Sequence, residues 1–275
     1  MINWRKYNGA IIPTLPPHVD VKETIEEILS FLIKSNAYFA RWTTNFDCLE
    51  ETEFWYVIKD TFQGLDELSG NTRKSIKKGL KNVCVKKVSK QYIINHGYNV
   101  YQKAFSKYNT YLSIKSHKQF VKELKSDIGV WDYWGVFNTE EALVGYSKNR
   151  ILNDVCDYYS TKFDPDYLKY RMSDVLFYKM TEYYLGERDF KYVSGGTRSI
   201  SHDTNIQKEY LRKFKFRKAY CHLQVTYNSK IYLLVRCLYP FRGLLSLLIF
   251  GSFRQLNILL TQESIRRSFS KIKDK

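Results

Sequence analysis

Residues 189–227 read DFKYVSGGTRSISHDTNIQKEYLRKFKFRKAYCHLQVTY and carry the clearest pattern in the chain. The run 190–193 predicts a short strand, which Gly195 and Gly196 are expected to end. Residues 216–227 alternate between apolar and polar side chains, and this period of two predicts a closing strand with one buried face. The stretch is therefore expected to form a strand, a polar turn, a helix and a second strand.

The polar turn between these strands supplies caps for the helix. Asp203 or Thr204 can accept hydrogen bonds from the first backbone N–H groups of a helix that runs to about Phe214. Towards the N-terminus, hydrophobic periodicity predicts further elements. They are helices over 91–108 and 116–128, strands over 133–137, 142–152 and 155–163, and a helix that begins at Ser173.

This order of elements resembles the GNAT superfamily of acyltransferases, and the run 211–220 resembles its passage from the last helix to the final strands. A helix containing LSGNTRKSIKK, followed by a strand over 83–88, resembles a feature of the FemABX-like peptidyltransferases, which are built from GNAT-like halves. The resemblance implies a mixed α/β (α+β) chain with the GNAT-like acyl-CoA N-acyltransferase fold. It implies a degenerate N-terminal half over 1–90, a complete acyltransferase domain over 91–228 and a C-terminal extension over 229–275.

Composition is compatible with a folded, basic protein. The chain has 275 residues, of which 44% are hydrophobic, and a net charge of +16. Such a charge favours nucleic acid, anionic lipid or a phosphorylated cofactor as partner, with simple solubility as the alternative. The five cysteines and five histidines show no metal-ligand or disulfide spacing, so we expect neither. The N-terminus lacks an apolar signal region, and we expect a cytoplasmic protein.

The resemblance also implies where an acyl donor would bind. GNAT-like folds admit the donor between two parallel strands that diverge, here 155–161 and 190–194, and its phosphates meet the N-terminus of the intervening helix. The implied donor is an acyl-CoA or an aminoacyl-tRNA, without a metal. The loop 169–174, KYRMSD, lacks the family's usual glycines. The side chains placed at the donor are Lys169, Arg171, Ser173 and Ser194.

Four side chains are candidates for proton transfer. GNAT enzymes usually place a tyrosine on the last helix as general acid, and the corresponding position here is Leu211. The neighbouring Tyr210 is therefore one candidate, and Asp157 on the first diverging strand is another. His202 and Asp203 lie in the polar turn, where a histidine can titrate near neutral pH. Helix capping is the alternative role for this turn.

A helix predicted over 65–80 is unusually basic. The stretch 73–90 has no acidic residue, and Leu68, Ile76 and Leu80 are expected to form the buried side of the helix. An exposed basic face suits a polyanion such as tRNA, and a merely solvated face is the alternative. The residues assigned to it are Arg73, Lys74, Lys77, Lys78 and Lys81.

The C-terminal extension is apolar and basic. None of its uncharged runs reaches the ~20 residues that a membrane span needs. Residues 243–260 are expected to form one or two helices that either pack on the domain or present an apolar face, flanked by arginines, to anionic membrane lipids. The second outcome would place the protein peripherally on the inner face of the membrane.

Together these features predict an enzyme that transfers an acyl or aminoacyl group to an amine. A cell-envelope glycan precursor, or another sugar amine of a polysaccharide, is the acceptor that the FemABX-like resemblance suggests. The basic run supports a nucleic-acid-binding module as the first alternative. Leu211 and the glycine-free loop support a catalytically inactive acyltransferase-fold scaffold as the second. The oligomeric state is not predicted.

Overall fold

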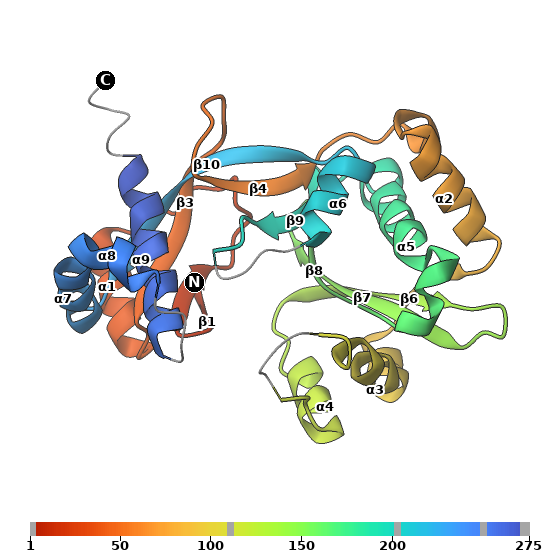
Figure 1. Cartoon of the computed structure of the whole chain (residues 1–275), viewed down its shortest axis with the longest axis horizontal. Helices are drawn as coiled ribbons and strands as arrows, with labels where there is room; N and C mark the ends of the chain where they lie inside the picture. Colours follow the sequence, from red (N-terminus) through yellow and green to blue (C-terminus); the bar gives the residue numbers. More distant parts are fainter. Residues whose placement is uncertain (1–3, 109–112, 201–204, 248–251, 270–275) are drawn as a thin grey trace. The chain divides into compact units, whose positions relative to one another are not determined.

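The computed structural model describes residues 4–108, 113–200, 205–247 and 252–269 (Figure 1). Its contacts group the chain into two compact units. The first unit consists of 1–56, 197–205 and 218–275, and the second of 57–196 and 206–217. The predicted boundaries at 90 and 228 therefore fall inside these units, and β4, Phe54–Lys59, contains the residues at which the chain first passes from one unit to the other.

The second unit is built on a mixed sheet, in which the strands follow the order β5, β6, β7, β8 and β9. The first four are antiparallel neighbours, whereas β9 runs parallel to β8. The strands are β5 (Cys84–Val88), β6 (Val130–Phe137), β7 (Leu143–Leu152), β8 (Val155–Phe163) and β9 (Tyr192–Thr197). Four antiparallel strands followed by a parallel fifth confirm the expected mixed α/β architecture.

Helices cover both faces of this sheet (Figure 1). On one face α3 (Lys90–Phe105) and α4 (His117–Lys125) bury apolar side chains against Tyr133 of β6 and Tyr146 of β7. On the other lies α5, Met172–Thr181, which continues as the π-helical turn η3, Glu182–Glu187. The side chains of Trp134 and Tyr158 point to this face, where both rings contact Tyr184 of η3. Alternation along the strands therefore serves two helical layers.

The basic helix is shorter than predicted. The short helix η1, Gly64–Glu67, comes first, and α2, Gly70–Leu80, begins after Ser69, whose side chain caps it by accepting from the Thr72 N–H group. Leu68 and Ile76 are buried as expected, but Leu80 is 42% exposed.

That last expectation was wrong because the buried stripe of α2 runs through Thr72, Ile76 and Gly79. A Cβ atom on Gly79 would lie 2.4 Å from Val175 Cγ2 and 3.1 Å from the Arg171 carbonyl oxygen. The glycine lets α2 approach the start of α5, and Leu80, one residue further round the helix, points outward.

The fold of residues 189–227 corrects one boundary. Gly195 and Gly196 do not end the strand, because β9 runs through both to Thr197. The helix follows as α6, Asn205–Lys213, and the closing strand as β10, Arg217–Tyr227. Buried side chains alternate with half-buried ones along β10, as the sequence pattern predicts.

In the first unit β10 pairs antiparallel with β3, Phe39–Cys48, and β3 pairs parallel with β2 of a small hairpin. Helix α1, Ile25–Lys34, buries Ile28 and Leu32 against this layer. Val235, Ile265 and Phe269 pack on β10 from the C-terminal helices. The remaining elements are β1 (Trp4–Tyr7), β2 (Ala10–Pro13), α7 (Ser229–Leu238), η4 (Tyr239–Phe241), α8 (Arg242–Leu245) and α9 (Ser252–Ser268).

Candidate active site

The parallel strands β8 and β9 separate part-way along their length. Their paired residues are Val155 with Tyr192, Cys156 with Val193 and Asp157 with Ser194. Beyond that last pair β8 continues to Phe163 and β9 to Thr197. The prediction of neighbouring parallel strands that diverge towards their C-terminal ends is confirmed. Helix α5, which connects them, begins at Met172, one residue from the predicted start.

Local contacts organise β9 where it leaves β8. The Gly196 N–H group donates to Ser194 Oγ at 3.0 Å, and Gly196 has a φ of +88°, which few residues other than glycine adopt. The Gln207 side chain of α6 donates to the Gly195 carbonyl at 3.3 Å. Ser194 is 2% exposed. In this conformation its hydroxyl shapes the strand end, and its predicted contact with a donor stays a prediction.

Tyr210 of α6 packs directly on this strand end. A Cβ atom on Gly195 would lie 2.6 Å from Tyr210 Cδ2. The Tyr210 ring stacks on Phe216 with centroids 4.8 Å apart and meets Phe177 edge-on at 4.9 Å. Burial, and after it the charge of Asp157, raises the pKa of Tyr210 well above its usual range. The phenol therefore keeps its proton at neutral pH and cannot serve as a base.

Two predicted site residues from distant parts of the sequence, Asp157 and Ser194, lie opposite each other in the last β8–β9 pair, and Tyr210 packs on the next residue of β9, Gly195, from the α5 side of the sheet. Asp157 is half-buried and faces Ser194 across the last β8–β9 pair, and its charge acts on Tyr210. The catalytic roles assigned to these side chains stay predictions. His202 and Asp203 lie outside the described residues, so their positions are not part of this picture.

The start of α5 is the predicted site for the donor's phosphates. The short helix η2, Pro165–Tyr170, leads into Arg171, which has a left-handed backbone with φ 60°. Lys169 and Arg171 are exposed and Ser173 is half-buried. Two cationic side chains therefore stand in solvent beside the N-terminus of a helix, where the helix dipole also favours an anion.

The first turn of α5 already holds a carboxylate of its own. Asp174 is 3% exposed, accepts from Ser75 Oγ of α2 at 2.6 Å and pairs with Lys213 of α6 at 3.2 Å. Burial acts to lower the pKa of Lys213, but its contacts with Glu209 and Asp174 outweigh burial and raise it. This cluster ties three helices together. The Asp174 carboxylate also adds a negative charge at the start of α5, so we expect an anion there to be held by the exposed Lys169 and Arg171 side chains.

The basic face of α2 is present as predicted. Lys74, Lys77, Lys78 and Lys81 are exposed, and Arg73 is half-buried, with Nη1 3.2 Å from Asp66 Oδ1. None of the four lysines has an ion pair among the salt bridges of the described residues. The face is therefore available to a polyanion.

A buried set of hydrogen bonds on the α5 side of the sheet was missed. The Tyr184 hydroxyl donates to Asp132 Oδ2 at 2.9 Å and accepts from Trp134 Nε1 at 3.0 Å. Asn149, fully buried on β7, lies 3.5 Å from the same hydroxyl, and Lys87 Nζ closes the outer end 2.8 Å from Asp132. The available signal was an asparagine in the middle of a central strand, because a buried amide there needs partners.

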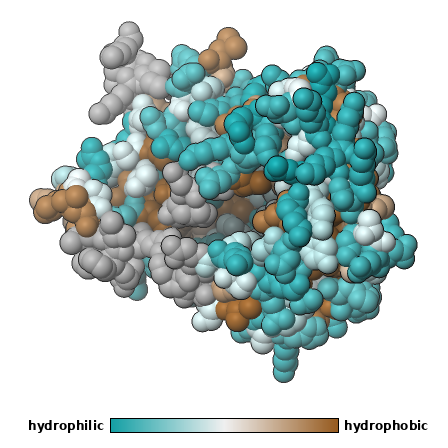
Figure 2. Space-filling view, turned by 45° about the vertical axis from the view of Figure 1, so that its right-hand side comes forward, coloured by the Kyte–Doolittle hydropathy of each residue, from teal (hydrophilic) through white to brown (hydrophobic). Residues whose placement is uncertain are grey.

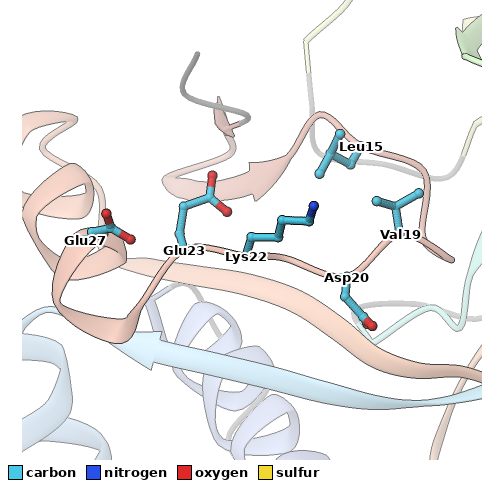
Figure 3. A pocket seen from close by; sticks show the side chains of 6 residues that line it. All are labelled: Leu15, Val19, Asp20, Lys22, Glu23 and Glu27. Atoms are coloured by element: carbon cyan, nitrogen blue, oxygen red, sulfur yellow. The ribbon is translucent and has the colours of Figure 1, made fainter.

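The structure also contains a surface pocket in the first unit, of about 440 Å³ (Figure 3). Glu27 already caps α1 by accepting from the Thr24 N–H group at 2.8 Å. Three carboxylates and one ammonium make the pocket unsuited to an anionic donor. The lining residues are Leu15, Val19, Asp20, Lys22, Glu23 and Glu27.

Two further properties bear on the predicted partners. Within the described ranges, no three or more His, Cys, Asp or Glu side chains are grouped as a metal site. In the same part of the chain, no helix combines the length and apolarity that a bilayer crossing requires.

Comparison with known proteins identifies the fold. The structure is similar to that of FemX, with a TM-score of 0.55 and 8% identity over 84% of this chain and 85% of that one. It is similar to the C-terminal domain of a putative lysylphosphatidylglycerol synthetase from Agrobacterium fabrum, with a TM-score of 0.51 and 10% identity over 85% of this chain and 82% of that one. It is also similar to L-PGS from Bacillus licheniformis, with a TM-score of 0.50 and 10% identity over 95% of this chain and 84% of that one.

The chain therefore has a GNAT/FemABX-like acyltransferase fold, as the resemblance implies. No protein-family model and no curated protein sequence matches it. The structural similarity establishes the fold, but sequence identities of 8–10% do not identify a substrate.

Proposed function

We propose that this protein is an acyltransferase that moves an acyl or aminoacyl group to an amine at the point where β8 and β9 diverge. The observation that carries the proposal is the strand pair itself, whose ladder ends at Asp157 and Ser194 while both strands continue. We propose that the donor enters where the ladder ends and pairs with backbone groups of the two strands, as an added strand would. Two cationic side chains, Lys169 and Arg171, stand at the start of the connecting helix.

The reaction would be attack of an amine nitrogen on the donor's carbonyl carbon. A C–N bond forms, the C–S bond of a thioester or the C–O bond of an ester breaks, the amine loses a proton and the leaving sulfur or oxygen gains one. Asp157, half-buried where the strands part, is the proposed acceptor of the amine proton. Tyr210, which packs on β9 at Gly195, is the proposed donor to the leaving group. His202 and Asp203 are the alternative pair.

The donor could be an acyl-CoA or an aminoacyl-tRNA. We favour the aminoacyl-tRNA, because the exposed lysines of α2 offer a second cationic surface for its phosphates. A ligand as small as coenzyme A does not need such a second surface. The start of α5 has no glycine and carries the Asp174 carboxylate in its first turn, and both features disfavour a tightly seated pyrophosphate. A lipid-carried glycan precursor is the proposed acceptor class.

The competing function is that of a catalytically inactive scaffold with the same fold. The specific observation behind it is Tyr210, which is 2% exposed and enclosed by Phe177 and Phe216. A scaffold of this kind would bind neither donor productively.

Thermal-shift measurements with acyl-CoAs, aminoacyl-tRNA and deacylated tRNA, followed by a transfer assay to a model amine, test the proposal. A donor that binds only the folded state increases the free energy of unfolding by RT ln(1 + [L]/Kd) and so raises the melting temperature. We expect Arg171→Ala to weaken donor affinity by ~1.5–3 kcal/mol, as for a lost charge-assisted hydrogen bond, with little change in stability. Lys125→Ala, which removes an exposed charge from α4, is the control. Absence of any donor effect would leave the inactive scaffold.

A further inference from the structure

The C-terminal helices of the first unit present an apolar surface to solvent. On α7 Leu233 is 62% exposed, and on η4 Phe241 is 60% exposed. Leu244 of α8 and Leu247 just after it are 69% and 72% exposed. Apolar side chains of this kind stand out from an otherwise largely hydrophilic surface (Figure 2). Together with Tyr232 and Leu234, both also exposed, these residues form what we call the α7–α8 surface.

This exposure does not come from a loosely attached helix. Val235 is 2% exposed and Ile231 packs against the same core, which also contains Phe54 and Leu223. The Asn228 side chain caps α7 by accepting from the Ile231 N–H group at 2.9 Å and donates to the Ala37 carbonyl at 3.1 Å. The inner side of α7 is therefore already packed, and its outer apolar residues need another partner.

The charged side chains of α7 and α8 are all cationic. Lys230, Arg236 and Arg242 are exposed within it, and the chain has no Asp or Glu from 228 to 262. The Arg242 guanidinium lies over the Tyr239 ring at 4.4 Å. By helical spacing Lys230 and Arg236 flank Leu233 on the side of α7 opposite the buried Val235, so cationic and apolar groups share the outer face. That combination is typical of helices that lie in the headgroup region of an anionic bilayer.

We propose that the α7–α8 surface docks on an anionic lipid bilayer, without crossing it. Leucine and phenylalanine side chains enter the interface, and the arginine and lysine side chains pair with lipid phosphates. Two copies of this chain do not suit each other at this face, because both would bring the same arginine and lysine side chains, in molecules of net charge +16. The inference rests on this surface alone and does not depend on acyl transfer.

Flotation of the full chain with vesicles tests the inference without donor or acceptor. We expect the protein to float with phosphatidylglycerol-containing vesicles and much less with pure phosphatidylcholine. Leu233→Ser with Leu244→Ser should lower the partition coefficient by about tenfold or more, because each leucine loses apolar burial in the interface. Arg236→Gln with Arg242→Gln should remove most of the preference for anionic lipid.

The matched control is Leu49→Ser with Ile128→Ser. Both residues are over 90% exposed, at 102% and 91%, and lie outside the α7–α8 surface, so this variant should float like the parent chain. All variants change solvent-exposed side chains, and unchanged circular dichroism verifies that they fold. No flotation of the parent chain, or equal flotation of Leu233→Ser/Leu244→Ser, would overturn the proposal. The proposal would also be overturned if the parent chain did not bind vesicles and light scattering showed a dimer that Leu233→Ser/Leu244→Ser dissociates.

Discussion

Single glycines set how closely helices approach in the second unit. Gly79 lets α2 lie against the start of α5, and Gly195 lets the Tyr210 ring lie on β9. The sequence pattern predicts that Gly195 ends its strand, and that interpretation was wrong. A chain shows where a side chain is missing, but the group that fills the space comes from a residue far away in sequence.

Glu263 provides a prediction at the same scale. Burial acts to raise its pKa, but hydrogen bonds from Arg266 at 2.7 Å, Arg267 at 2.6 Å and the Tyr227 hydroxyl at 3.1 Å outweigh burial and lower it. A carboxyl group whose pKa is lower in the folded state stabilises the fold above its unfolded pKa, and this contribution is lost as pH falls through the folded pKa.

We therefore expect Glu263→Gln to destabilise the fold by ~1.5–3 kcal/mol at neutral pH and to make stability less sensitive to acid below about pH 4.5. Urea unfolding between pH 3 and 7 measures both effects. Glu50→Gln, at an exposed position of the first unit, should leave the profile unchanged. A parallel acid profile for Glu263→Gln and the parent chain would show that Glu263 makes no such contribution.

Elements were predicted well where one face is buried along their whole length. Strand β8 and helices α3 and α4 lie close to their expected ranges, because a period of 2 or 3.6 residues reports burial directly. The predicted helix over 65–80 ends at Leu80 as expected, but its start was wrong, since Ser69 caps a helix that starts at Gly70, and so was the expected burial of Leu80, which faces solvent. A serine side chain can bond the first backbone N–H groups of a helix and so fix where the helix starts, which the spacing of apolar residues does not reveal.

The basic face of α2 leads to a prediction at the scale of this element. If the face contacts a polyanion, Lys77→Gln with Lys78→Gln should reduce the slope of log Kd against log salt for tRNA binding by roughly two units, one for each released counterion. Filter binding over a range of salt concentrations measures the slope. Both lysines are exposed, so stability should stay the same.

Lys118→Gln with Lys122→Gln on α4 is the matched control, since it removes two exposed lysines from another helix of the same unit. Its slope should equal that of the parent chain. Equal slopes for both double variants would identify α2 as a solvated basic helix without a role in binding.

Each compact unit of the whole molecule gathers segments that are distant in sequence. All five cysteines are free thiols, so the reactivity of each one can be used to measure how deeply it is buried in its unit. Cys84 and Cys237 are exposed, whereas Cys156 belongs to the core of the second unit and Cys221 to that of the first. Burial raises the pKa of both buried thiols, which reduces their reactive thiolate form.

Labelling with a thiol reagent should therefore show Cys84 and Cys237 reacting first. We expect Cys156 and Cys221 to react at least about a hundredfold more slowly, because they need an opening of the core. Mass spectrometry assigns each label to its residue, and urea should make all five thiols reactive. In Cys84→Ser/Cys237→Ser the fast phase should disappear, apart from any contribution of the half-exposed Cys48. Early labelling of Cys156 would contradict the packing described for the second unit.

The order of strands and helices over 84–227 followed from local patterns of apolar side chains and caps, and the resemblance of that order to the GNAT superfamily implied the acyltransferase fold. The pairing of Asp157 with Ser194, the packing of Tyr210 on β9 and of α2 on the start of α5, and the outward face of α7 and α8 did not. These depend on which distant segments fill the space around a residue. An apolar helix reads the same in sequence whether its second face meets a core or solvent, and only packing distinguishes the two.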